Sequence, residues 1–304
     1  MPPVFRRCVE VTRSAAQLHA LACELARITG AAFGFIGEAA NSVGGYVAKA
    51  LPTALNAYEM FARPRKAYVL LGVEPELDCY NPQQAISALK QADLVLMLTS
   101  FKHEAALDYA DVLLPTAPFT ETSGTFISSE GRVQGFNGVC RPLGDARPGW
   151  KVLRVLGNVL DIPGFAYDSS EQVRDEIIPS GMSFAAGLDN AINGIALTPV
   201  AGTGGLQRIA DVPIFFADSL VRRGAALQLT RDAAVPVARM CAATLAQAGI
   251  ADGSPVRVKQ GQGEALLTAC LDESVPAACV RLAAAHVSTA ALGDMFGTII
   301  VERA

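Results

Sequence analysis

The sequence predicts an α/β fold with a doubly wound, mostly parallel sheet, followed by a smaller β-rich domain. Short apolar runs at residues 66–71, 94–98 and 112–114 alternate with helical segments, as in sheets built from βαβ units. A chain of 304 residues is long for a single core. After about residue 212 the pattern changes to short strands separated by glycine-containing turns. These observations together favour two domains.

The first predicted helix covers residues 13–29. Its apolar residues recur at three- and four-residue steps, and Gly30 stands where a helix-ending glycine is common. A strand at 31–36 and a short helix ending near residue 51 follow. The apolar positions of the first helix are Leu18, Leu21, Leu25 and Ile28.

After Lys66, the run at residues 66–71 is continuously apolar, which is typical of a strand covered on both faces of a parallel sheet. A helix at 83–91 should connect it to the strand at 94–98. The next strand, 112–114, is expected to stop at Pro115, since proline cannot donate to a ladder. Two further helices are predicted, at 150–160 and from Ser169 or Ser170 to just before residue 179.

We expect an α/β Rossmann-like domain at residues 1–180, a linker at 181–211 and a second domain at 212–304. The linker assignment rests on a change of composition toward Gly, Ala, Asn and Thr, in which apolar residues show only weak periodicity. Within the second domain the pattern predicts a helix that Gly249 ends, with strands on both sides. The predicted elements are a strand at 227–230, the helix at 240–248 and strands at 255–259, 264–270 and 278–283.

Composition excludes several classes of function. The net charge of −4 gives no electrostatic footprint for nucleic acid, and no basic cluster suggests an anionic membrane surface. The longest uncharged run, 190–207, contains a proline and four glycines and would make a poor membrane span. No signal pattern is present at the N-terminus, so we expect an intracellular chain. Its seven cysteines lack C-x-x-C spacing and are expected to be buried, reduced thiols.

The most informative segment is residues 110–134, ADVLLPTAPFTETSGTFISSEGRVQ. A buried strand is followed by a turn at 122–124 and by two half-strands, 125–128 and 132–134. Open α/β sheets place their ligands in such polar loops. Gly124 is expected to adopt a positive φ in the turn, so that Gly124→Val should destabilise the domain by about 1–3 kcal/mol.

This segment resembles the molybdopterin oxidoreductase superfamily, whose pattern reads approximately A-D-V-x-L-P, E-x-x-G-T and N-x-E-G-R-x-Q. Within it, the segment is most similar to the family of the G-type subunit of bacterial NADH-quinone oxidoreductase (respiratory complex I). The order of elements at 240–283 resembles the double-psi β-barrel of the same superfamily. The matching positions are Glu121, Gly124, Thr125, Glu130, Gly131, Arg132 and Gln134.

The resemblance implies a structural portion of a larger subunit, without a cofactor or catalytic residue of its own. It implies that 4Fe-4S and 2Fe-2S clusters lie in an absent N-terminal part and relay electrons from NADH to quinone. It also implies partners among the other hydrophilic subunits, on the cytoplasmic face of the bacterial inner membrane. One alternative is the cofactor-clamping half of a molybdopterin enzyme of the formate dehydrogenase kind. Another is a pure binding module.

Two departures from the superfamily pattern suggest a degraded cofactor pocket. Glu74 replaces an Asn in the loop that begins at Gly72, and a carboxylate there would repel a pyrophosphate. Ser128 replaces an Asn and offers a shorter reach and fewer hydrogen bonds. The same loop could simply end a strand. The pocket candidates, none expected to bind a cofactor, are Gly72, Glu74, Thr125, Ser128, Glu130 and Arg132.

Other chemistry has little support in the sequence. Glu121 and Glu130 could serve as acid and base, but pairing with Arg132 is the simpler expectation. The histidines are far apart and lack metal-ligand spacing, so no metal site is expected. Residues 221–223, Val-Arg-Arg, lie near an apolar stretch and could bury against a neighbouring subunit.

Overall fold

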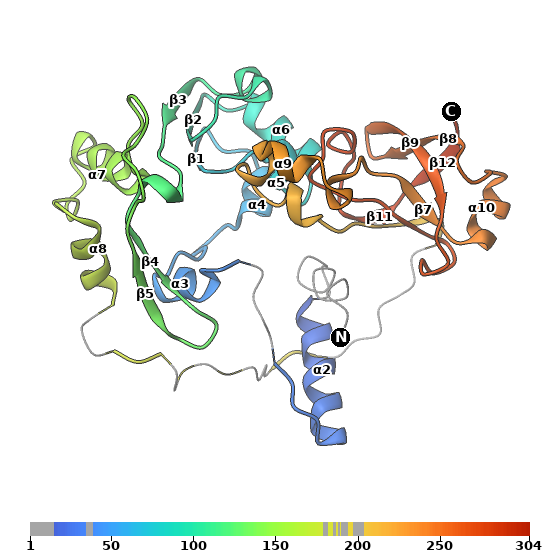
Figure 1. Cartoon of the computed structure of the whole chain (residues 1–304), viewed down its shortest axis with the longest axis horizontal. Helices are drawn as coiled ribbons and strands as arrows, with labels where there is room; N and C mark the ends of the chain where they lie inside the picture. The colour runs from blue at the N-terminus through green and yellow to red at the C-terminus, as the bar shows by residue number, and fades with distance from the viewer. Residues whose placement is uncertain are drawn as a thin grey trace.

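A computed structural model describes residues 15–34, 39–178, 182–184, 187, 189, 194–196 and 204–304. Figure 1 shows two lobes in contact, with helix α2 (Ala15–Thr29) projecting away from them. We call residues 39–178 the first lobe and residues 204–304 the second lobe.

A parallel sheet with strand order β1-β2-β3 organises the first lobe, and it confirms the three predicted strands. The strands are β1 (Ala67–Leu71), β2 (Leu94–Thr99) and β3 (Val112–Pro115). The helices are α3 (Ser42–Val47), α4 (Ala57–Ala62), α5 (Pro75–Asp78), α6 (Pro82–Lys90), α7 (Gly149–Val159) and α8 (Ser170–Ile177), with 3-10 turns η1 (Glu104–Asp108) and η2 (Phe119–Glu121).

Only one face of this sheet is well covered, which corrects the expectation of two covered faces. Val95 and Met97 are fully buried against α6, whereas Val69 is 56% exposed and Leu71 is 49% exposed. The cause is topological. Strand order follows chain order, so right-handed crossovers place both connections on the same side.

The segment after β3 forms the expected hairpin, made of β4 (Gly124–Ile127) and β5 (Val133–Phe136). It is anchored to α3, because the Ile127 N–H donates to the Asn41 side-chain oxygen (2.9 Å). The prediction of a positive φ at Gly124 is wrong, since this residue lies in regular strand. A glycine is needed there for another reason, because an added Cβ would lie 2.6 Å from the Phe136 ring.

The second lobe is a curled mixed sheet, of order β11-β6-β10-β7-β9-β8-β12 among the described residues. This confirms the predicted fold class of a parallel α/β sheet followed by a barrel-like sheet. Alternation along β8 buries Val256 and Val258 completely in the core. The elements are β6 (Gln207–Ile209), η4 (Ile214–Phe216), η5 (Val221–Arg223), α9 (Ala225–Gln228), η6 (Arg231–Ala233), β7 (Ala238–Met240), α10 (Ala242–Ala248), β8 (Pro255–Gln260), β9 (Gly263–Leu271), β10 (Cys279–Arg281), β11 (Phe296–Thr298) and β12 (Ile300–Arg303).

Several predicted elements differ from the structure. Residues 227–230 are not a strand, because helix α9 starts after Gly224 and runs to Gln228, and the Gln228 side-chain amide donates to the Phe215 and Val221 carbonyls. Residues 31–34 are irregular, and 35–36 lie outside the described residues. Strand β6 falls inside the expected linker 181–211, so the second sheet begins before residue 212. The domain limits otherwise stay a prediction.

Helix α2 forms as predicted, but none of its residues is buried. Its apolar stripe is between 36% exposed, at Leu18, and 67% exposed, at Ile28. Within the described ranges, every helix is too short or too polar to cross a bilayer.

Candidate functional site

The loop after β1 begins where the sequence places a phosphate-binding turn. Gly72 has a φ of +63°, and its N–H donates to the Leu98 carbonyl at the end of β2 (2.8 Å). Glu74 is the residue before α5, and its carbonyl accepts the N–H groups of Leu77 and Asp78. Its own N–H donates to the Asp78 carboxylate (2.6 Å). The loop is therefore closed by its own hydrogen bonds.

The Glu74 side chain points into a buried ion-pair network instead of into open solvent. Glu74 is only 2% exposed. Arg222 Nη1 donates to its Oε2 (3.0 Å), and Arg223 Nη2 lies 2.6 Å from its Oε1, although that N–H is not directed at the oxygen. The second guanidinium nitrogen of Arg222 donates to Asp78. Both arginines belong to η5 of the second lobe, so the pairs bridge the two lobes.

A second acid–base contact lies beside the first. His103, between β2 and η1, places Nε2 3.0 Å from Glu76 Oε1 and Nδ1 3.8 Å from Glu74 Oε1. The Tyr109 hydroxyl donates to the other Glu76 oxygen (3.0 Å). We call Glu74, Glu76, Asp78, His103, Arg222 and Arg223 the inter-lobe charge cluster.

The cluster shifts the pKa values of its members. The adjacent Glu76 carboxylate raises the pKa of His103 despite the opposing effect of burial. Burial acts to raise the pKa of Glu76, but the close contact with His103 and the hydrogen bond from Tyr109 outweigh it, and the net shift is downward. Burial, with the carboxylates nearby, raises the pKa of Cys79 to about 12. The imidazolium and carboxylate forms are therefore favoured, while the thiol stays protonated.

Next to the charge cluster, uncharged polar contacts join the lobes. The Gln83 amide nitrogen donates to the Gln260 and Ala291 carbonyls (2.9 and 2.7 Å). The Asn81 amide nitrogen donates to Asp294 (2.6 Å), and its oxygen caps α6 by accepting the Gln84 N–H. The start of α6 is thus fixed to the second lobe.

The second lobe also buries one arginine close to these contacts. Arg208 on β6 is 2% exposed and donates to the Gln260 side chain (2.9 Å) and to the Gly293 and Asp294 carbonyls. Burial lowers its pKa to about 10. The charge is held by neutral acceptors, so this site is a structural support of the lobe contact.

The candidate pocket residues separate into two places. Gly72 and Glu74 lie in the loop after β1, whereas Thr125, Ser128, Glu130 and Arg132 lie on the β4–β5 hairpin, which extends away from the sheet in Figure 1. The Ser128 hydroxyl accepts the N–H groups of Glu130 and Arg132 (3.3 and 3.2 Å). Ser128 therefore stabilises its own turn.

The expected pairing of Arg132 with a carboxylate is not found among the described residues. Glu121 instead accepts the Leu143 N–H (3.1 Å). In the described part of the chain, no group of three or more His, Cys, Asp or Glu side chains could hold a metal ion. Of the cysteines, Cys140 is exposed and Cys241 is buried, so the expectation of uniform burial is wrong.

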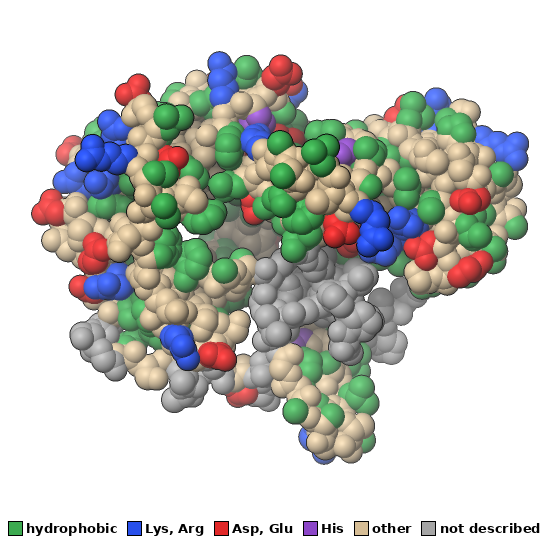
Figure 2. Space-filling model, viewed as in Figure 1, with side chains coloured by type: hydrophobic (Ala, Val, Ile, Leu, Met, Phe, Trp, Pro, Cys, Tyr) green, Lys and Arg blue, Asp and Glu red, His purple; other side chains and the backbone are tan. Residues whose placement is uncertain are grey.

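Three cavities adjoin Trp150 at the start of α7, with volumes of about 520, 270 and 570 Å³. The first lies between Leu114 of β3 and the apolar side of α7. The third carries cations and carboxylates together, including Arg147, Lys151 and Asp168. On the face seen in Figure 2, positive and negative side chains are interspersed. None of these cavities includes a member of the inter-lobe charge cluster.

The inter-lobe charge cluster fits poorly with a pyrophosphate-bearing cofactor at the loop after β1. Three carboxylates face two arginines and a histidine, so the cations already have partners. A bound pyrophosphate would have to replace Glu74 at the arginines. It would leave a carboxylate that is 2% exposed without a counter-ion, which costs several kcal/mol.

Sequence reasoning missed the arginines and the histidine of this cluster. The sequence suggested that Arg222 and Arg223 could bury against a neighbouring subunit, and in the structure they neutralise Glu74 of the same chain. The sequence assigned no role to His103, which pairs with Glu76. A signal was available, since an unpaired Glu in a βα loop needs a cation from elsewhere, but the sequence does not show from where.

Known proteins with similar sequences point to the same fold. The molybdopterin oxidoreductase family matches residues 6–159. A Staphylococcus haemolyticus protein named as a formate dehydrogenase is 31% identical over 121 residues, covering 40% of this chain and 11% of the relative. The G-type subunit of NADH-quinone oxidoreductase from Mycobacterium bovis is 30% identical over 211 residues, covering 66% of this chain and 25% of the relative.

Among solved structures, acetylene hydratase from Pelobacter acetylenicus has the same fold, with a TM-score of 0.60 at 14% identity. The match covers 98% of this chain and 51% of the hydratase. The chain therefore spans a quarter or less of these two curated relatives and about half of the structural neighbour. Because the family match extends over half of its residues, the chain belongs to the molybdopterin oxidoreductase family.

Proposed function

We propose that this chain is a cofactor-free structural portion of the G-type subunit of an NADH-quinone oxidoreductase. The observation that carries the proposal is the pairing of Glu74 with Arg222 and Arg223. It fills, with the chain's own charges, the edge of the parallel sheet at which open α/β folds bind nucleotide-like ligands. The longer stretch of similarity to the G-type subunit supports the same assignment.

In this proposal the cluster joins the two lobes into a rigid scaffold. Three short ion pairs and the amide contacts of α6 cross the lobe boundary. The iron–sulfur clusters belong to other parts of the subunit. The partners are further hydrophilic subunits of the complex, at the cytoplasmic face of the bacterial membrane.

A second candidate is the cofactor-clamping half of a molybdopterin-dependent oxidoreductase. It is favoured by the family match over residues 6–159 and by 31–34% identity to proteins named as formate dehydrogenases. Here the two lobes would grip the pterin, and the Glu74 pairs would have to open.

The experiment that separates them is pterin and metal analysis of the full-length protein, purified from a host that makes the molybdenum cofactor. Acid oxidation converts bound molybdopterin into a fluorescent pterin, and mass spectrometry measures molybdenum and tungsten. A molybdenum enzyme from the same host serves as the positive control. We expect no pterin above background. One pterin per chain, with stoichiometric metal, would establish the second candidate instead.

A further inference from the structure

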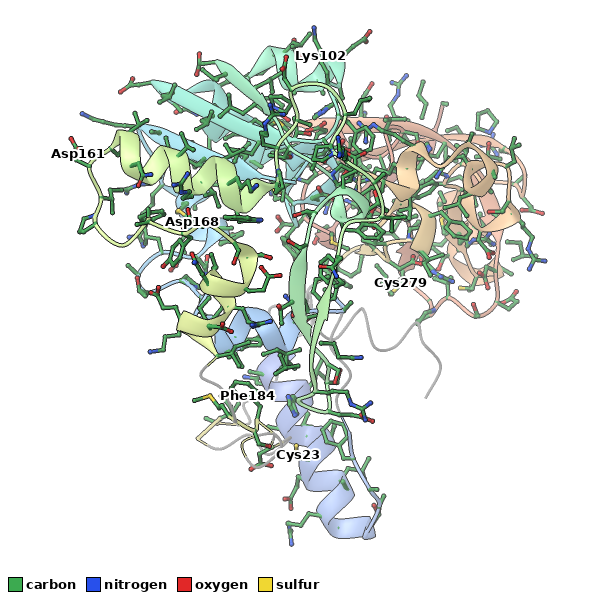
Figure 3. All side chains as sticks on the ribbon, turned by 60° about the vertical axis from the view of Figure 1, so that its left-hand side comes forward. Cys23, Lys102, Asp161, Asp168, Phe184 and Cys279 are labelled. Atoms are coloured by element: carbon green, nitrogen blue, oxygen red, sulfur yellow. The ribbon has the colours of Figure 1, made fainter. Side chains whose placement is uncertain are left out.

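Three cysteines of the second lobe lie on neighbouring strands. Cys279 begins β10, Cys270 lies on β9, and Cys241 follows β7 directly. Figure 3 shows Cys279 in this lobe, well apart from Cys23 on α2. All of these cysteines are free thiols.

The strand register, continued one residue past the end of β7, places two of them opposite each other. Strands β7 and β10 are antiparallel, with Arg239 opposite Arg281. Two residues further along, the same register sets Cys241 against Cys279. Cys241 keeps an extended backbone, with φ −71° and ψ 163°, so the strand direction continues through it. Residues two apart on a strand share a face, so both side chains lie on the side of Arg239 and Arg281.

This geometry is suitable for a covalent link. Opposed residues of an antiparallel pair have Cα atoms about 4.5–5.5 Å apart, and disulfides form across Cα separations of about 4.4–6.8 Å. One hydroxyl also connects the two positions. Thr244 Oγ1 lies 3.2 Å from Cys241 Sγ and accepts the Ala278 N–H (3.1 Å), immediately before Cys279.

Cys270 has a different neighbour. The parallel register of β7 and β9 puts it beside Arg239, whose Nη1 donates to its sulfur (3.6 Å). It is therefore diagonal to Cys241 instead of opposite it. Its place on the same sheet makes it a matched control.

We propose that Cys241 and Cys279 are a modification site, a dithiol that a low-molecular-weight disulfide converts into a cross-strand disulfide. One thiolate of the pair attacks the reagent and releases one thiol, forming a mixed disulfide. The other cysteine then attacks the protein sulfur of this mixed disulfide and releases the second thiol. Two protein thiols are oxidised, and one disulfide is reduced to two thiols.

The environments of the two thiols differ. Hydrogen bonding at Thr244 lowers the pKa of Cys241, while burial raises the pKa of Cys279. A cavity of about 300 Å³ is lined in part by Thr244 and Ala278, the residues that precede or contact the two cysteines. The new bond would join the start of α10 to β10 and close the loop that contains β8 and β9.

The test uses the full chain in oxidised and in reduced glutathione, followed by alkylation and mass spectrometry. Trypsin combined with cleavage after Glu273 separates Cys270 from Cys279 in different peptides. We expect a Cys241–Cys279 peptide pair in the oxidised sample only, together with a higher Tm. The variant C270S should keep both effects, and C279S should lose both.

Several results would overturn the proposal. They are a bond to Cys270, a glutathione adduct at Cys241 or Cys279 that never resolves, or three alkylated thiols after oxidation. The peptide map of the wild-type chain decides the question even where a variant fails to fold.

Discussion

The ion pairs between the lobes make a quantitative prediction for Arg222→Met. Arg222 is 9% exposed and Glu74 is 3% exposed as side chains, so the pair is buried. The variant also removes the donors to Asp78 and to the Phe216 carbonyl (2.9 Å). Removing one partner of a buried pair costs about 3–5 kcal/mol. Arg223 still neutralises part of the Glu74 charge, so we expect a loss of about 3 kcal/mol in the free energy of unfolding.

The assay is urea unfolding followed by two probes. The single tryptophan, Trp150, reports on the first lobe, and far-UV circular dichroism reports on both. Arg231→Met, at an exposed position, is the matched control and should change stability by less than about 0.5 kcal/mol. In the double variant with Glu74→Gln, the buried charge is gone, so the combined loss should be smaller than the sum by about 1 kcal/mol or more.

This reasoning is refuted if Arg222→Met unfolds at the same urea concentration as Arg231→Met. Strict additivity with Glu74→Gln would also contradict it, because it would mean that the two side chains do not interact in solution.

Three further predictions concern His103 and two glycines. The folded pKa of His103 is raised above its unfolded value of about 6.5. The contribution of His103 to the free energy of unfolding is therefore complete below the unfolded pKa and is lost as the pH rises through the folded pKa. The stability difference between wild type and His103→Gln should accordingly be larger at pH 5.5 than at pH 8.5. Gly263→Ala should cost about 3 kcal/mol, since its Cβ would lie 1.7 Å from the Ala291 carbonyl oxygen. Gly124→Val should cost about 1–3 kcal/mol through the Phe136 ring, which is able to move.

Each of these has a control and a contradicting result. If the stability difference between wild type and His103→Gln does not vary with pH, the His103–Glu76 ion pair does not contribute to stability. Gly204→Ala, where an added Cβ meets nothing within 4 Å, is the control for both glycines. If either glycine variant has the same melting temperature as this control, the close contact inferred at that position does not exist in solution.

The sequence predicted the parts of the fold that depend on local pattern. The runs that became β1 and β2 are recognisable because apolar residues fill them without a break. The Ser169 cap of α8 and the left-handed Gly249 after α10 follow from local backbone requirements. The strand predicted at 227–230 failed because hydrogen bonds from Gln228 to distant carbonyls decide that conformation.

The candidate site was harder to predict, because its members meet only in the folded chain. The sequence already marks Glu74 as a departure from the pattern of a phosphate loop. Its partners are 148 and 149 residues further along, and a 3-10 turn presents them. No spacing rule connects such distant positions. Ser128 shows the opposite case, since its hydroxyl binds N–H groups only two and four residues away.

The central claim is that the chain's own charges occupy the edge of the sheet at which a cofactor would bind. The most direct measurement is a crystal structure of the full-length protein from a host that makes molybdopterin. The account predicts that Arg222 and Arg223 contact Glu74 across the lobes, with no pterin density at the loop after β1. Density for a pterin there, with Glu74 separated from both arginines, would contradict it.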